Sequence, residues 1–184
     1  MNFSKITCWG ATLIIPEFLV PLWPHELPLD KWPTFLGAGQ GWGDAIVPDS
    51  LHGVHLNPAG LCHDIEWACS EKNFSAFMGA NGRFFLNMVS LIIVSNLPTW
   101  TMIRALIEAG TIYLTAVCTM GFLFFSWFSK NHNEDINPFQ NPIVKDRLHR
   151  LATARNKYHE RPDERFQDTE DFSYRDDEKG CCNE

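Results

Sequence analysis

Positive charge is scarce in this sequence and is not gathered into a stripe. Its 15 Lys and Arg residues are outnumbered by 22 Asp and Glu residues, and the formal net charge is −7. Proteins bind a phosphate backbone mainly through clustered basic side chains. We therefore expect no nucleic-acid partner.

The cysteines lack the spacing of a zinc site or of a disulfide framework. The chain has six, none in a CxxC pair, at positions 8, 62, 69, 118, 181 and 182. We expect reduced thiols, most of them buried. Cys181 and Cys182 leave two interpretations open, an adventitious pair on a disordered end or a lipidated or metal-binding tail.

Charge of either sign is rare before residue 130. Of the 37 Asp, Glu, Lys and Arg residues, 23 lie in residues 130–184. The length suits one domain with appendages. We predict a proline-rich N-terminal wrap over residues 1–34, an apolar core over 35–129 and a charged C-terminal extension over 130–184.

The N-terminal segment ITCWGATLII lacks the remainder of a signal peptide. Pro16 and Glu17 follow it directly, and no small-x-small cleavage site stands out. We interpret this stretch as a buried or interfacial segment.

Hydrophobic periodicity predicts a mainly α protein. The first helix of the core runs from Pro58 to about Cys69, with Asn57 as its N-cap. A second helix over 75–95 carries an apolar stripe at spacings of three and four. That stripe consists of Phe77, Ala80, Phe84, Met88 and Leu91.

A third, long apolar helix is predicted from Trp100 to about Phe128, with Thr99 as its cap. Its residues 109–128 carry no charge and are long enough to span a bilayer. A central helix packed against the first two is the favoured interpretation, because Arg104 and Glu108 lie in its first turns. In the extension, residues 141–160 form an amphipathic helix with Ile143, Leu148 and Leu151 on its apolar side, and we expect residues 161–184 to be disordered.

Several motifs follow one another in a fixed order through the core. A loop with glycine at every second position, FLGAGQGWGDAIVPD, precedes the helix that bears the adjacent pair His63 and Asp64. The second helix then contains ANGRFFLNM. In this order and spacing the sequence resembles the phospholipase A₂ superfamily, and in particular its small, disulfide-poor bacterial and phage members, from residue 35 to about 128.

The resemblance implies a core of two antiparallel helices that carry the site, and hydrolysis of phospholipid acyl esters. His63 would be the general base that takes a proton from the attacking water. Asp64 would hold one Ca²⁺ ion together with loop carbonyls from Gly37, Gly39 and Gly41.

The sequence departs from the family pattern around the histidine. The carboxylate that orients the family's histidine is replaced by Asn81, and the supporting tyrosine by Trp67. A neutral amide oxygen accepts a hydrogen bond but supplies no charge. Glu66 is a possible substitute, although at that position a solvated surface charge is the more ordinary interpretation. A cysteine pair that joins loop and helix is also missing, at Leu36 and Gly60.

Two main hypotheses follow for the function. The first is a calcium-dependent phospholipid hydrolase with His63, Asn81 and Trp67 at its catalytic site. The second is a module with the same fold and no activity, which binds a membrane or a viral or bacterial assembly such as a phage particle. A single-span membrane protein is a third possibility. Under the first two, a peripheral membrane or virion-associated location fits better than secretion.

Overall fold

The structure is a computed structural model that describes residues 1–33, 50–71, 73–113, 115, 118–119 and 137–160. Within these ranges the protein is mainly helical, as the sequence predicts, with two short β-hairpins. The glycine-rich loop, most of the uncharged stretch 109–128, and the tail with Cys181 and Cys182 lie outside the described residues. The predictions made for them remain predictions.

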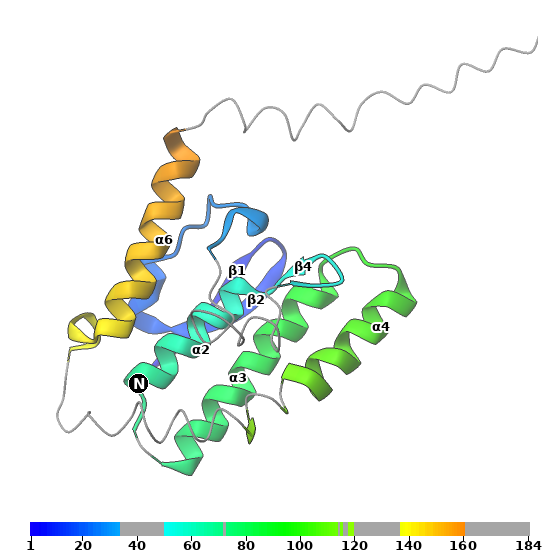
Figure 1. Ribbon diagram of the computed structural model, residues 1–184, viewed down its shortest axis with the longest axis horizontal. Helices are drawn as coiled ribbons and strands as arrows, with labels where there is room; N and C mark the ends of the chain where they lie inside the picture. The colour runs from blue at the N-terminus through cyan, green and yellow to red at the C-terminus, as the bar shows by residue number, and fades with distance from the viewer. Residues whose placement is uncertain (34–49, 72, 114, 116–117, 120–136, 161–184) are drawn as a thin grey trace, which may run out of the picture.

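Four α-helices lie side by side in one layer, in the spatial order α6, α2, α3, α4 (Figure 1). Their bounds are Asn57–Cys69 for α2, Phe74–Ile93 for α3, Thr99–Glu108 for α4 and Pro142–Glu160 for α6. Helices α2 and α3 are antiparallel, since Trp67 near the end of α2 stacks on Phe77 near the start of α3, while His63 stacks on Phe84. The helices predicted at 58–69, 75–95 and 141–160 are therefore present.

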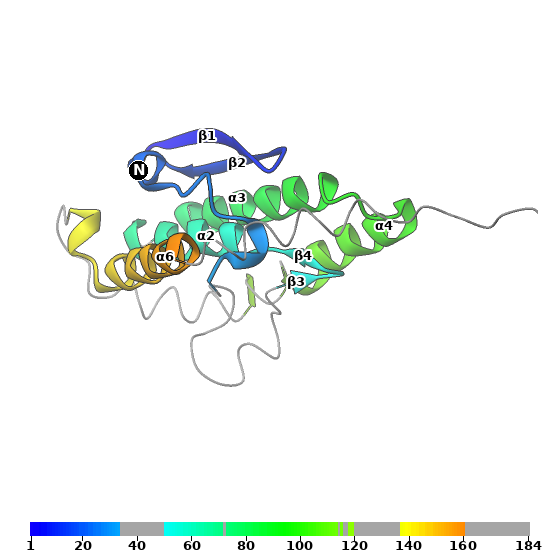
Figure 2. The same cartoon turned by 90° about the horizontal axis from the view of Figure 1, so that it is seen from above.

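An N-terminal hairpin covers one face of this layer (Figure 2). Strand β1 (Phe3–Cys8) pairs antiparallel with β2 (Ala11–Pro16), and β2 packs on α2 and α3. The turn uses Trp9 and Gly10 at φ 52° and φ 79°, the left-handed region that glycine adopts without strain. Within the predicted N-terminal wrap, residues 3–16 thus form a regular hairpin, in which alternate residues of both strands are buried in the period of two that defines a sheet.

The proline-rich stretch after the hairpin contains only short 3₁₀ turns, at Glu17–Leu22 (η1) and Leu29–Lys31 (η2). Its aromatic residues cluster beneath the hairpin turn. Trp32 packs edge-on against Trp9 and tilted against Trp23, while the Trp9 indole donates to the Leu27 carbonyl at 3.2 Å. The stretch is irregular, as predicted, but is fixed by this cluster.

Two helix caps differ from the sequence prediction. The structure begins α2 at Asn57 itself, with Leu56 as the N-cap and no side-chain capping bond. The Asn57 Oδ1 is buried and has no hydrogen-bond partner among the described residues. Helix α4 likewise begins at Thr99, and Pro98 precedes it as the cap.

The third predicted helix is described only in part. Helix α4 ends at Glu108 and continues as a π-helical turn, Ala109–Tyr113 (η3), beyond which most residues up to 136 are outside the described part. Where the structure is described, one helix, α3, is long and apolar enough to cross a membrane, while most of the uncharged stretch 109–128 lies outside the described residues. One face of α3 is buried against α2 and β2, as in the core helix of a globular domain.

A second, very short hairpin leads into α2. Strands β3 (Ser50–Leu51) and β4 (Val54–His55) are joined by a turn through His52 and Gly53. The His52 imidazole lies 3.0 Å from the Glu108 carboxylate at the end of α4. This contact links the hairpin that precedes α2 to the end of α4.

Candidate functional site

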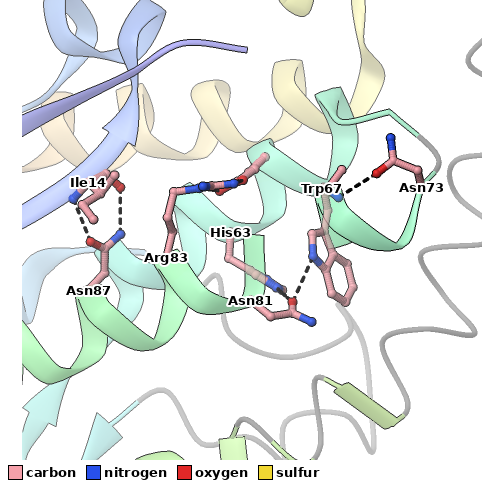
Figure 3. A network of polar contacts seen from close by, with 9 residues as sticks. Ile14, His63, Trp67, Asn73, Asn81, Arg83 and Asn87 are labelled. Atoms are coloured by element: carbon pink, nitrogen blue, oxygen red, sulfur yellow. Dashed lines mark hydrogen bonds and ion pairs between the residues drawn. The ribbon is translucent and has the colours of Figure 1, made fainter. Parts of the chain in front are cut away.

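The predicted contact between His63 of α2 and Asn81 of α3 is present. The His63 Nε2 lies 3.0 Å from the Asn81 Oδ1, and both side chains are buried (Figure 3). The contact follows from the packing of α2 against α3, because His63 shares one face of α2 with Glu66 and Trp67, which also contact α3. Asn81 lies in the buried stripe of α3.

Trp67 determines how the Asn81 amide is oriented. Its indole Nε1 lies 3.2 Å from the same Asn81 Oδ1, one helical turn after His63 (Figure 3). An indole nitrogen can only donate, so the amide must present its oxygen and not its NH₂ group to this side. The Asn81 Nδ2 is directed instead to the sulfur of Cys118, at 3.7 Å.

The orientation of the amide in turn determines the tautomer of His63. Because the Asn81 oxygen is an acceptor, His63 must carry its hydrogen on Nε2 in order to bond to it. In the neutral imidazole the lone pair is then on Nδ1. The basic nitrogen therefore lies on the side of the ring away from Asn81, next to Asp64.

The His63 ring is held between aromatic rings. Its centroid lies 4.2 Å from Trp67 and 4.6 Å from Phe84, and the residue is only 6% exposed. Packing on both sides restricts rotation of the imidazole. The ring is thus positioned before any ligand binds.

Asp64 has two neighbours with different chemistry. Its Oδ1 lies 3.7 Å from the His63 Nδ1, which is beyond hydrogen-bond distance, and its Oδ2 accepts from the Arg147 Nε at 2.9 Å. Arg147 belongs to α6, which packs on α2. The carboxylate that the family resemblance assigns to calcium therefore forms an ion pair with an arginine in this structure.

The described residues do not form a calcium site as they stand. Calcium in proteins takes six to eight oxygen ligands. The described part of the chain has no group of three His, Cys, Asp or Glu side chains that could hold a metal, and Asp64 is already paired. The carbonyls of Gly37, Gly39 and Gly41 lie outside the described residues, so this part of the predicted site has no structural test.

Glu66 has a different role from both interpretations considered for it. It is 3% exposed, so it is not a solvated charge, and the guanidinium of Arg83 from α3 binds both of its oxygens. The Arg83 guanidinium also lies 4.1 Å from the ring centre of Phe3. Because its carboxylate is neutralised in this way, Glu66 does not substitute for the missing carboxylate behind His63.

The thiol of Cys62, the residue before His63, is not a nucleophile. Burial raises the pKa of Cys62 far above its ordinary value, and the nearby Glu66 carboxylate adds to the effect. Burial also raises the pKa of Cys69 to about 11. Both side chains stay protonated at neutral pH, which leaves the imidazole as the basic group of this helix.

Sequence reasoning missed Arg147. It is 83 residues from Asp64, and only the basic, amphipathic character of residues 141–160 pointed to its helix. Comparison of the chain with protein-family models, with curated proteins and with solved structures found no match. The function must therefore be argued from the site itself.

Proposed function

We propose that the protein hydrolyses acyl esters of phospholipids, with His63 as the general base. The observation that supports this most strongly is the pair of donors, His63 Nε2 and Trp67 Nε1, on the single oxygen of Asn81. In the neutral imidazole this arrangement places the lone pair on Nδ1 of a buried ring.

In the proposed reaction His63 Nδ1 takes a proton from a water molecule as the water oxygen attacks the ester carbonyl carbon. The proton then passes to the leaving alcohol oxygen as its bond to the carbonyl carbon breaks. The products are a fatty acid and a lysophospholipid. Asn81 orients the imidazole throughout and accepts from Nε2 in both protonation states.

Calcium remains a proposal drawn from the resemblance. When bound, a divalent cation at Asp64 would supply positive charge toward the developing oxyanion. No step above depends on it, because Arg147 occupies Asp64 in this structure.

The lipid substrate is supported by apolar side chains left on the surface of the helix layer. On α4, Trp100 is 77% exposed and Ile107 is 58% exposed, and on α3, Phe74 is 67% exposed. Large apolar groups at a surface often mark contact with lipid or with another protein. The same observation favours the second candidate function, an inactive module that binds a membrane or a viral or bacterial assembly.

Release of fatty acid from vesicles separates these two functions. We expect the wild-type protein to release fatty acid from mixed phosphatidylcholine and phosphatidylglycerol vesicles, and His63→Gln to lose this activity. His159→Ala is the matched control, because His159 lies at the exposed end of α6, where its Nε2 is 3.5 Å from the Glu26 Oε1, and it belongs to none of the contacts of His63 given above. If a folded wild-type protein binds the vesicles and releases nothing, the binding module replaces the hydrolase.

A further inference from the structure

The end of strand β1 brings a thiol against an imidazole. The Cys8 Sγ lies 3.1 Å from the His25 Nδ1, and the thiol donates to this nitrogen when the ring carries its hydrogen on Nε2. Cys8 is buried, at 6% exposure, whereas His25 lies at the surface of the proline-rich stretch. The pair therefore lies where the core meets solvent, and it shares no residue with the site at His63.

The segment Trp23-Pro24-His25 holds the imidazole at the thiol. Pro24 restricts the residue before it to extended backbone, and Trp23 has φ −71° and ψ 123°. The His25 N–H then donates to the Trp23 carbonyl at 3.0 Å. The position of His25 relative to Cys8 is thus set by a short, constrained turn.

The indole of Trp23 supplies a donor to the same sulfur. Its side chain is 5% exposed, and its Nε1 has no hydrogen-bond partner of ordinary geometry among the described residues. Burial raises the pKa of Cys8, and the Trp23 N–H, which is directed toward the sulfur, opposes this effect. A buried donor without an acceptor is unfavourable, and this donor gains one when the sulfur becomes negatively charged or acquires an oxygen atom.

The other thiols in the described part of the chain lack this arrangement. Cys62 and Cys69 of α2 are not hydrogen-bonded to an imidazole there, and burial raises the pKa of both. The Cys118 sulfur is approached by the Asn81 Nδ2 at 3.7 Å, and an amide nitrogen cannot take its proton. Cys8 alone among them has a base in contact with its sulfur, which is the arrangement that activates a thiol as a nucleophile.

We propose that Cys8 is a site of reversible oxidation by hydrogen peroxide, with His25 as the base and Trp23 as the donor to the product oxygen. The Cys8 proton moves to the His25 Nδ1, and the sulfur attacks one peroxide oxygen. The S–O bond forms as the O–O bond breaks, and the leaving hydroxide takes the proton from His25 and departs as water. The sulfur is oxidised by two electrons to a sulfenic acid, and the peroxide is reduced.

The sulfenic acid is returned to the thiol by two equivalents of an external thiol. The first displaces water to form a mixed disulfide, and the second releases Cys8 by exchange. The small exposure of Cys8 favours an oxidant the size of hydrogen peroxide over a bulky hydroperoxide. This inference goes beyond the proposed hydrolase and does not depend on it.

Trapping of the sulfenic acid with dimedone tests the proposal. The full chain is treated with hydrogen peroxide, and the initial rate of labelling at each cysteine is measured by peptide mass spectrometry. We expect Cys8 to be labelled faster than Cys62 and Cys69, and His25→Gln to slow labelling of Cys8 about tenfold or more. His149→Gln makes the same change at an exposed histidine of α6 and should react as the wild type does. Dithiothreitol added before dimedone should remove the label.

Two further variants separate chemistry from packing. In His25→Gly, added imidazole should restore labelling of Cys8, because the missing ring is at the surface. Trp23→Phe keeps the aromatic packing against Trp32 but lacks the donor, and its rate should lie between those of the wild type and His25→Gln. Circular dichroism confirms that each variant is folded.

The proposal is overturned by equal rates in the wild type and His25→Gln, or by labelling of Cys8 only after unfolding in urea. A slow His25→Gly protein that imidazole does not restore would assign His25 to packing and also overturn it. An unchanged rate in Trp23→Phe would remove the role given to the indole.

Discussion

The Asn81 oxygen accepts two hydrogen bonds, from His63 at 3.0 Å and from Trp67 at 3.2 Å. In the serine-protease triad, replacing the aspartate with asparagine costs about 10⁴ in rate because the imidazole takes the wrong tautomer. Here the indole prevents that outcome by holding the amide oxygen toward the ring. What the amide still lacks is the charge that stabilises an imidazolium, so we expect a cost on the order of 10–10³.

Restoring that charge should increase the rate. In Asn81→Asp a carboxylate oxygen can accept from both donors without moving either helix, and the negative charge stabilises His63 when it becomes protonated. We expect turnover on phospholipid vesicles to rise roughly tenfold or more, about 1.4 kcal/mol of transition-state stabilisation. His63→Gln in the same background should abolish the gain. An unchanged rate in a folded Asn81→Asp protein would contradict the role given to His63.

Trp67→Phe tests the orientation of the amide. The ring remains to pack against His63 and Phe77, but the donor that distinguishes oxygen from nitrogen on Asn81 is lost. We expect the nitrogen-15 chemical shifts of His63 to show a mixture of tautomers, and turnover to fall roughly tenfold. In Trp67→Phe combined with Asn81→Asp the loss should disappear, because both oxygens of a carboxylate are acceptors. A single tautomer in Trp67→Phe would show that another contact orients the amide.

At the scale of elements, α3 connects the candidate site to the hairpin above it. The Asn87 side chain, six residues after Asn81, accepts from the Ile14 N–H at 2.7 Å and donates to the Ile14 carbonyl at 2.9 Å (Figure 3). A side-chain amide thus takes the place of a third strand beside β2. The hairpin is held in register over α3 by these two bonds and by Ser90, which accepts from the Thr12 N–H at 2.9 Å.

Asn87→Ala should therefore destabilise the whole domain. The substitution leaves the N–H and the carbonyl of Ile14 without their partners in a part-buried position, and each such group costs about 1–3 kcal/mol. We expect the free energy of unfolding in urea to fall by roughly 2–4 kcal/mol. Ser90→Ala breaks a solvent-exposed bond and should cost less than about 1 kcal/mol. Equal effects of the two variants would show that the hairpin does not depend on Asn87.

The joint between α4 and the second hairpin should be sensitive to acid. Arg104 and then His52 lower the pKa of Glu108 from its ordinary value of 4.5. A carboxyl with a lowered pKa in the folded state contributes stability above the unfolded value, and that contribution is lost as the pH falls through the folded value. Glu108→Gln should thus melt at a lower temperature than the wild type at pH 7, and the difference should shrink as the pH falls below 4.5 and vanish once the carboxyl is protonated in the folded state. A difference that persists in acid would assign the effect to packing.

For the molecule as a whole, the features that could be predicted from the sequence are the helices and buried stripes that follow from local periodicity. The stripe on α3 from Phe77 to Leu91 is buried as its spacing indicates. His63 and Asn81 were paired from the motifs of two helices that are adjacent in sequence. The hairpin at residues 3–16 was missed because its alternation is short and its apolar run resembles a buried segment. The partners of Glu66 and Asp64 were missed because Arg83 and Arg147 come from other helices, and no local pattern pairs a carboxylate with a distant cation.

The distance along the chain between Asp64 and Arg147 has a consequence for how the protein is made. A ribosome completes α2 and α3, with His63 and Asn81, well before it synthesises residues 142–160. Until α6 emerges, Asp64 has no arginine, and the Ala68 carbonyl has not yet received the Asn141 side chain. The nascent chain therefore passes through a stage in which His63 and Asn81 can form their contact while the side of α2 that packs on α6 is still exposed.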